Sequence, residues 1–284
     1  MTGWYPDPGD SRQLRWWDGY RWTAYTAAYP PHQPPPPELE AAVAAMRQQD
    51  ARPWGWRPVV VPITALVAII VLGRVVGRWE PEHGSGRVAF VAVGNLVVEG
   101  LLAVALYVAG RAVAARYGGW GPTFGWRRPR VRDFPVATLG FLASLAMRLV
   151  LGVILAILSG GAANEQAENV HLSHVDPITV VFLVVVAVVA APLTEELMFR
   201  GLLLRTFMRR WSFWPSAFAS TAIFGLFHTY EVGTLLGALT LALTVGLMGL
   251  VNCYLVRVTN RLFPGILVHA ASNALAVLVV VLTA

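Results

Sequence analysis

Residues 178–206 read ITVVFLVVVAVVAAPLTEELMFRGLLLRT, an apolar run that carries Glu195, Glu196 and Arg200 in its second half. The run exceeds the roughly 20 residues that an α-helix needs to cross the hydrocarbon core of a bilayer. Three ionisable residues would cost on the order of 10 kcal/mol if they faced lipid without partners. The run therefore predicts a membrane helix whose charged residues face a functional interior, and catalysis is the leading explanation for them.

Six more apolar runs predict that the chain is an all-α, polytopic transmembrane helical bundle. Short connectors separate the runs, as expected for successive membrane spans. The seven expected spans lie at 58–77, 88–110, 134–158, 178–206, 213–231, 234–256 and 263–283. The connector at 111–133 is long enough to hold an eighth helix, either re-entrant or interfacial.

The composition agrees with this fold class. Of the 284 residues, 56% are hydrophobic and 13% are charged, well below the roughly 25% charged residues of soluble domains. All 22 basic residues are Arg, and they cluster between the apolar runs. This pattern is typical of a polytopic protein and not of a nucleic-acid-binding surface. We therefore expect no nucleic-acid partner, despite the net charge of +6.

The distribution of Arg predicts the orientation in the membrane. The connectors at 111–133, 207–212 and 257–262 contain Arg, whereas the connector at 159–177 contains none. By the positive-inside rule, the Arg-rich connectors lie in the cytoplasm. With seven spans, the N-terminus is then cytoplasmic and the C-terminus extracytoplasmic in a multi-pass protein of the plasma membrane. No cleavable signal peptide is expected, and the single Cys253 excludes a disulfide framework.

Residues 1–25 predict a small aromatic β-hairpin module in front of the bundle. Asp18-Gly19 lies between aromatic residues and favours the positive φ angles of a hairpin turn. Residues 26–57 are expected to form a proline-rich linker and a short polar helix, and the transmembrane domain then occupies 58–284. Aromatic rings beside a hairpin can bind a polyproline II helix, so a proline-rich partner is one expectation for this module. Association with the membrane surface is the alternative.

Three pairs of residues recur at a spacing of four, which places each pair on one face of a helix. The pairs are Glu196 and Arg200, Phe224 and His228, and His269 and Asn273. Glu195 is rotated by about 100° from Glu196. We therefore expect Glu196 and Arg200 to form a structural lock and Glu195 to be the working carboxylate. A single buried ion network of all three is the alternative. Residue counts from the expected cytoplasmic ends of the spans place His269 and Asn273 at a shallower depth in the membrane than Glu195 and His228.

A carboxylate, two imidazoles and an amide are the groups that hydrolyse a peptide bond with an activated water. Glu195 would take the proton of the water, aided by His228, while His269 and Asn273 would hydrogen-bond the oxyanion. Zinc could instead be held by His228, His269 and Glu195, since catalytic zinc has three protein ligands and a water. The sequence contains no HExxH motif, so ordinary zinc-protease spacing does not apply.

EExxxR, FxxxH and HxxxN, in this order on late spans, resemble the motifs of the CAAX-protease and bacteriocin-processing family of intramembrane endopeptidases. The resemblance covers residues 130–284 and implies a protease-like core with a cavity among these helices. It implies that the site residues are Glu195, Glu196, Arg200, His228, His269 and Asn273. The family has been described both as metalloproteases and as metal-free glutamate proteases, so Zn²⁺ is an open expectation. Membrane lipids and a peptide or membrane-protein substrate, lipidated or not, are the partners that it implies.

The sequence leaves open two alternative functions and the roles of several further polar residues. A non-catalytic member of the same family could act as a binding or bacteriocin-immunity protein, and a transporter is less favoured. The N-terminal residues resemble the GWYPDP…WDGxxWT module of actinobacterial membrane proteins, whose function is undescribed. Glu99 and Arg148 could form a buried ion pair, or Glu99 could lie at a helix end or bind substrate. Asn95 and Asn252 are expected to be interhelical hydrogen-bonding residues outside the site.

Overall fold

The computed structural model describes residues 3–7, 9–10, 13–18, 22–28, 55–76, 79, 85–159, 177–229 and 234–283. The expected polar helix and most of the proline-rich linker lie outside these residues, as does most of the connector at 159–177. The described chain is helical apart from a small sheet near the N-terminus.

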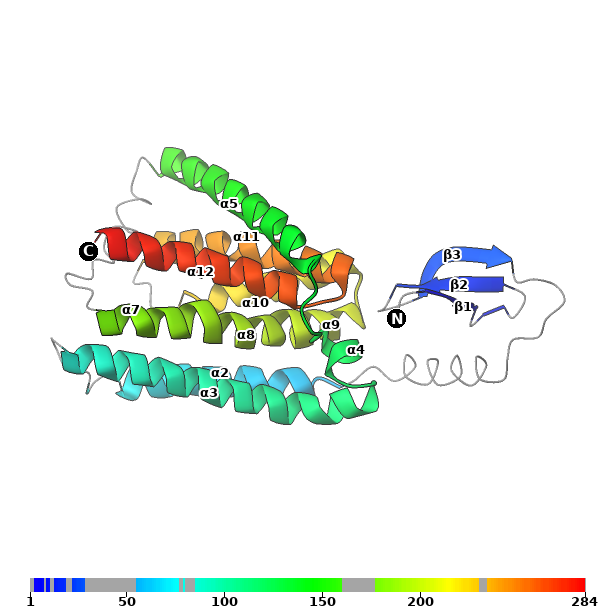
Figure 1. The fold of residues 1–284 in the computed structure, drawn as a ribbon, viewed down its shortest axis with the longest axis horizontal. Helices are drawn as coiled ribbons and strands as arrows, with labels where there is room; N and C mark the ends of the chain where they lie inside the picture. The colour runs from blue at the N-terminus through cyan, green and yellow to red at the C-terminus, as the bar shows by residue number, and fades with distance from the viewer. Residues whose placement is uncertain are drawn as a thin grey trace.

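The bundle consists of long helices that run side by side (Figure 1). They are α2 (Arg57–Val76), α3 (Ser85–Arg116), α5 (Asp133–Leu158), α10 (Phe213–Phe227), α11 (Leu235–Thr259), α12 (Phe263–Thr283) and one continuous composite helix. The composite helix joins α7 (Pro177–Leu183), η2 (Val184–Ala190), α8 (Ala191–Glu196), η3 (Leu197–Leu203) and α9 (Leu204–Met208). Each of these seven helices falls on one of the expected apolar runs.

Four helical segments among the described residues are long and apolar enough to cross a membrane. They are Val93–Arg116, Asp133–Leu158, Val180–Met208 and Leu235–Thr259. The apolar helices Pro58–Leu72, Phe213–Phe227 and Phe263–Val279 are shorter. The predicted fold class, a polytopic helical membrane bundle, is confirmed. In the connector expected at 111–133, α3 continues to Arg116, and the one separate helix is α4 (Trp120–Phe124), whose five residues are too few to cross a bilayer.

The composite helix occupies the middle of the bundle. In Figure 1 it lies between α12 on one side and α3 on the other, and both helices contact it. Two of its segments, η2 and η3, are π-helical and flank the turn that carries Glu195 and Glu196. Pro192 is the second residue after η2, and a proline removes the N–H that an α-helix needs at that position. Short π-helical segments occur frequently at functional sites.

A buried ion pair and a hydrogen bond hold the connectors at the Arg-rich end of the bundle. Arg261, before α12, lies 2.9 Å from the carboxylate of Asp133 at the start of α5, and both side chains are buried. Arg205 donates a hydrogen bond of 3.0 Å to the Oδ1 atom of Asn260. Asn260 ends α11 with a φ angle of 53°, a left-handed conformation that Asn tolerates better than most residues. The expected cytoplasmic end is therefore a closely packed part of the protein.

The N-terminal module is a three-stranded antiparallel sheet and not only a hairpin. Its strands are β1 (Gly3–Pro6), β2 (Gln13–Trp17) and β3 (Trp22–Ala28), in the order β1-β2-β3. Trp17 pairs with Trp22 across the expected hairpin, and their rings meet edge to face at 5.2 Å. Gly19 in the expected turn lies outside the described residues. Strand β3 runs three residues past the boundary expected at residue 25.

We expect the Arg-rich end of the bundle to face the cytoplasm, which makes a direct prediction for topology. Reporter fusions after residues 120 and 165 should report opposite sides, because only α5 separates the two positions and it is long enough to span. The measurement is the activity of paired fusions to a cytoplasmic and an extracytoplasmic reporter. Reports from the same side would show that α5 does not cross the membrane.

Candidate active site

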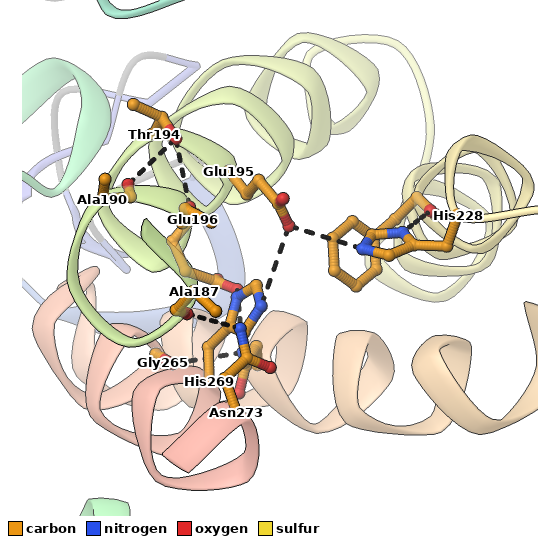
Figure 2. A network of polar contacts seen from close by, with 12 residues as sticks. Ala187, Ala190, Thr194, Glu195, Glu196, His228, Gly265, His269 and Asn273 are labelled. Atoms are coloured by element: carbon orange, nitrogen blue, oxygen red, sulfur yellow. Dashed lines mark hydrogen bonds and ion pairs between the residues drawn. The ribbon is translucent and has the colours of Figure 1, made fainter. Parts of the chain in front are cut away.

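Glu195 lies at the point where three helices meet. Its Oε2 atom is 3.8 Å from the Nε2 atom of His228 on α10 and 3.7 Å from the Nε2 atom of His269 on α12. Figure 2 shows the carboxylate pointing between the two imidazoles. The Glu195 side chain is 19% exposed, and its Oε2 atom is buried without a hydrogen-bond partner among the described residues. One carboxylate and two ring nitrogens thus face a common point inside the bundle.

The expectation that His269 is shallower than Glu195 is wrong. The His269 ring is as close to the Glu195 carboxylate as the His228 ring is, although α12 begins at Phe263 as expected. Counting residues from helix ends assumes straight α-helices that run parallel and start at one level. The composite helix departs from that assumption, because π-helical segments adjoin the turn with Glu195 on both sides.

Glu196 and Arg200 form the expected structural lock, a buried ion pair beside Glu195. The Nη1 atom of Arg200 lies 3.1 Å from the Oε1 atom of Glu196, and both side chains are fully buried. The same carboxylate oxygen accepts hydrogen bonds from Asn252 Nδ2 at 2.9 Å and from His269 Nδ1 at 3.1 Å. Three donors on one oxygen fix Glu196, so it is not free to act on a substrate. The spacing of four residues correctly predicted that the two side chains share a helix face.

Phe224 supports both imidazoles and the guanidinium of Arg200. The Cζ atom of Arg200 lies 4.2 Å from the centre of the Phe224 ring, a cation–π contact in a water-poor interior. The rings of His228 and His269 meet the Phe224 ring edge to face, at 4.7 and 5.9 Å. Gly249 is required beside this stack, because a Cβ atom there would overlap the Nη2 atom of Arg200.

Hydrogen bonds at Nδ1 orient both imidazoles and set their tautomers. The Nδ1 atom of His228 lies 2.8 Å from the backbone oxygen of Phe224, and the Nδ1 atom of His269 contacts the Glu196 carboxylate. Both partners can only accept, so each Nδ1 atom carries the proton. In the neutral rings, each Nε2 atom then presents a lone pair toward Glu195.

Asn273 is held by the backbone of the composite helix. Its Nδ2 atom donates a hydrogen bond of 2.7 Å to the backbone oxygen of Ala187 in η2. One amide N–H of Asn273 is used in this bond, and the second can serve another acceptor. The residue therefore ties α12 to the helix that carries Glu195, and the described contacts do not place it against Glu195 itself.

Two stretches of the chain match protein-family models. Residues 177–275, which hold all six candidate residues, match the model described as type II CAAX prenyl endopeptidase Rce1-like. These residues are an Rce1-like domain. Residues 2–38 match a separate model, DUF2510, a domain of unknown function. No curated protein and no solved structure matches the chain. The match supports a membrane endopeptidase at the level of the family.

Asn252 is a residue of the Rce1-like domain that the sequence did not assign to the site. Besides Glu196, its amide contacts the backbone oxygen of Gly265 at 3.2 Å. It therefore connects α11 to the start of α12 as well as to the lock. The interhelical role was predicted correctly, but no motif on α11 indicated that the partner is Glu196.

The expected pair of Glu99 and Arg148 does not form. Arg148 donates to Ser272 Oγ at 3.1 Å and to the backbone oxygen of Ser144 at 3.4 Å. Glu99 lies within α3, well away from its ends, and accepts a hydrogen bond from the hydroxyl of Thr194. The sequence could not indicate these partners, because hydroxyl donors of this kind are common on membrane helices.

As placed, the Glu195 carboxylate lies somewhat farther from the two imidazoles than two ligands of one zinc ion lie from each other. Nitrogen and oxygen ligands lie about 2.0–2.2 Å from zinc, which places two donors of one tetrahedral ion about 3.4 Å apart. Glu195 lies 3.8 and 3.7 Å from the two Nε2 atoms. In the described ranges, no group of three His, Cys, Asp or Glu side chains has the arrangement to hold a metal ion.

Proposed function

We propose that the protein is an intramembrane endopeptidase that hydrolyses a peptide bond by means of water activated by Glu195. The observation that carries the proposal is the position of the Glu195 carboxylate between two Nε2 atoms whose rings are fixed at Nδ1. A contact of more than 3.5 Å between polar groups leaves room for a bridging water. A water bonded to Glu195 and to one imidazole would have its oxygen oriented for attack.

In the first step, Glu195 takes a proton from this water while the water oxygen attacks the carbonyl carbon of the scissile bond. The C=O double bond becomes a C–O single bond, and its electron pair moves to the oxygen. His228 Nε2 accepts the second hydrogen of the water and so orients the nucleophile. In the second step, the electron pair of the oxyanion re-forms the C=O double bond as the C–N bond breaks. The protonated Glu195 gives its proton to the leaving nitrogen, which restores the Glu195 carboxylate.

His269 and Asn273 would stabilise the negative oxygen of the tetrahedral intermediate. His269 can donate from Nε2 in the form that carries a proton on both ring nitrogens, and Glu196 accepts the hydrogen bond from its Nδ1 atom. Asn273 can donate through the amide N–H that does not bond to Ala187. Glu196, Arg200 and Asn252 would act as positioning residues, since they hold His269 and the helix of Glu195 in place.

The substrate that we propose is a lipidated peptide or a membrane protein with a segment near the membrane surface. The description of the matching family as CAAX prenyl endopeptidases supports a prenylated peptide as the first candidate. The test uses purified protein in phospholipid nanodiscs, with a farnesylated peptide that ends in a CAAX sequence and the same peptide without the lipid. We expect internal cleavage of the farnesylated peptide, measured by the masses of both products. Intact peptides in both cases would contradict the proposed activity.

We expect the activity to survive removal of metal ions. The proposed mechanism assigns every proton transfer to Glu195 and none to a metal-bound water. The measurement compares cleavage before and after dialysis against a strong chelator, with re-addition of Zn²⁺ as the control. Loss of cleavage on dialysis and its recovery with zinc would show that Glu195, His228 and His269 bind a metal, and the metal-free steps above would be wrong.

A further inference from the structure

A cavity lies on the side of α8 that faces α3, away from the two imidazoles. Its volume is about 560 Å³, within the range of pockets that bind small molecules. The walls are mainly apolar and include Leu96 of α3 and Leu193 and Leu197 of the composite helix. Tyr107, Trp120 and Trp126 also line the cavity, and the rings of Tyr107 and Trp120 stack with their centres 6.1 Å apart. We refer to this cavity as the α3–α8 groove.

Glu99 is the one acidic or basic residue among the described residues that line the α3–α8 groove. Its carboxylate accepts a hydrogen bond from Thr194, and the described Arg and His side chains form no ion pair with it. A carboxylate offers about four acceptor positions, so one hydroxyl leaves most of them unused. In mainly apolar surroundings such a group is stabilised by a cation or by further donors.

The α3–α8 groove is elongated, and its charged residue, Glu99, lies at a different point along it from the aromatic rings. Glu99 and Tyr107 are eight residues apart on α3, which corresponds to about 12 Å along the helix. Between them lie Gly100 and Ala103, whose small side chains keep the groove open. A Cβ atom at Gly100 would meet no atom within 4 Å. A linear molecule with a charge at one end matches this arrangement.

We propose that the α3–α8 groove binds a cationic single-chain amphiphile from the membrane. Its amino or ammonium group pairs with Glu99, and its apolar chain extends toward Trp120 and Trp126. Thr194 and Glu195 are consecutive residues and point about 100° apart on their helix. The groove is therefore a second ligand site, separate from the face with the two imidazoles, and the proposal does not depend on peptidase activity.

The test is photoaffinity labelling of the full chain in phosphatidylcholine nanodiscs. The probe is dodecylamine with a photoreactive diazirine at the far end of the chain, and labelled peptides are identified by mass spectrometry. We expect labelling near Trp120 and Trp126. Dodecylamine and dodecyltrimethylammonium should compete at concentrations at least about tenfold lower than dodecanol, because only the two cations neutralise Glu99. Equal competition by dodecanol would overturn the proposal and indicate a neutral ligand.

Four variants make the result specific. Glu99→Gln should reduce labelling at least about tenfold, since it removes the charge and keeps the shape. Gly100→Leu should reduce labelling by filling the groove, whereas Gly94→Leu should not. Gly94 is on the same helix, also has open space at Cβ and does not line the groove. Unchanged labelling of Glu99→Gln would contradict the proposal. Labelling of Glu195→Gln should equal that of the wild type, which separates this result from any loss of peptidase activity.

Discussion

Replacement of Arg200 by Ala should destabilise the protein by about 3–5 kcal/mol, because it leaves the Glu196 carboxylate charged in a buried position without its main partner. Both side chains are fully buried, and Arg200 also contacts the Phe224 ring that supports the two imidazoles. Activity should fall together with stability. The measurement is the free energy of unfolding in mixed micelles, obtained from a denaturing-detergent titration followed by circular dichroism.

A matched control and a double variant separate the lost ion pair from a general effect of removing Arg. Arg132 is exposed at the start of α5, and Arg132→Ala should change the unfolding free energy by no more than about 0.5 kcal/mol. The double variant Glu196→Gln with Arg200→Met should recover part of the loss, since it leaves no unpaired charge. If Arg200→Ala were as stable as Arg132→Ala, the ion pair between Glu196 and Arg200 would not stabilise the protein.

The helices and the first layer of the site could be predicted from the sequence because both depend on local patterns. A run of apolar residues determines a membrane helix largely without reference to the rest of the chain. A spacing of four determines that Glu196 and Arg200 share a face. The rotation between adjacent helical residues likewise separates Glu195 from Glu196. The family motifs then indicated that His228 and His269 approach the same carboxylate.

Contacts between helices could not be predicted in the same way, because they depend on tilt, depth and rotation. Asn252 bonds to Glu196 across 56 positions of sequence, and Asn273 bonds to Ala187 across 86. The Ala187 oxygen belongs to a π-helical segment that no residue pattern indicated. The same limitation explains why the sequence left the partner of Glu99 open, with Arg148 as one candidate, when the hydroxyl of Thr194 is its partner.

In the N-terminal module, too, one part of the structure could be predicted from the sequence and another could not. The hairpin that joins β2 to β3 follows from Asp18-Gly19 between aromatic residues. Strand β1 was not predicted from the sequence. The structure pairs Gly3–Pro6 with β2 and holds the following turn through Asp7. The carboxylate of Asp7 accepts hydrogen bonds from Gly9 N at 2.7 Å and from Arg15 Nε at 2.9 Å.

The largest loss of activity is expected for Glu195→Gln. The amide nearly preserves the shape of the side chain but cannot take a proton from water, so general base catalysis is lost. Because Glu195 Oε2 has no hydrogen-bond partner among the described residues, the variant should be as stable as the wild type. It thus differs from Arg200→Ala, which should lose both stability and activity. His228→Ala and His269→Ala should also lose activity, while Arg132→Ala should keep it.

The rate of peptide cleavage by Glu195→Gln in nanodiscs, compared with the wild type at equal amounts of folded protein, tests the account most directly. General acid–base catalysis contributes about 10²–10⁴-fold to a rate, so we expect kcat/KM to fall by at least about a hundredfold. Glu195→Asp, which keeps the carboxylate but withdraws it from the two imidazoles, should retain intermediate activity. Cleavage by Glu195→Gln at the rate of the wild type would contradict the assignment of Glu195 as the residue that activates water.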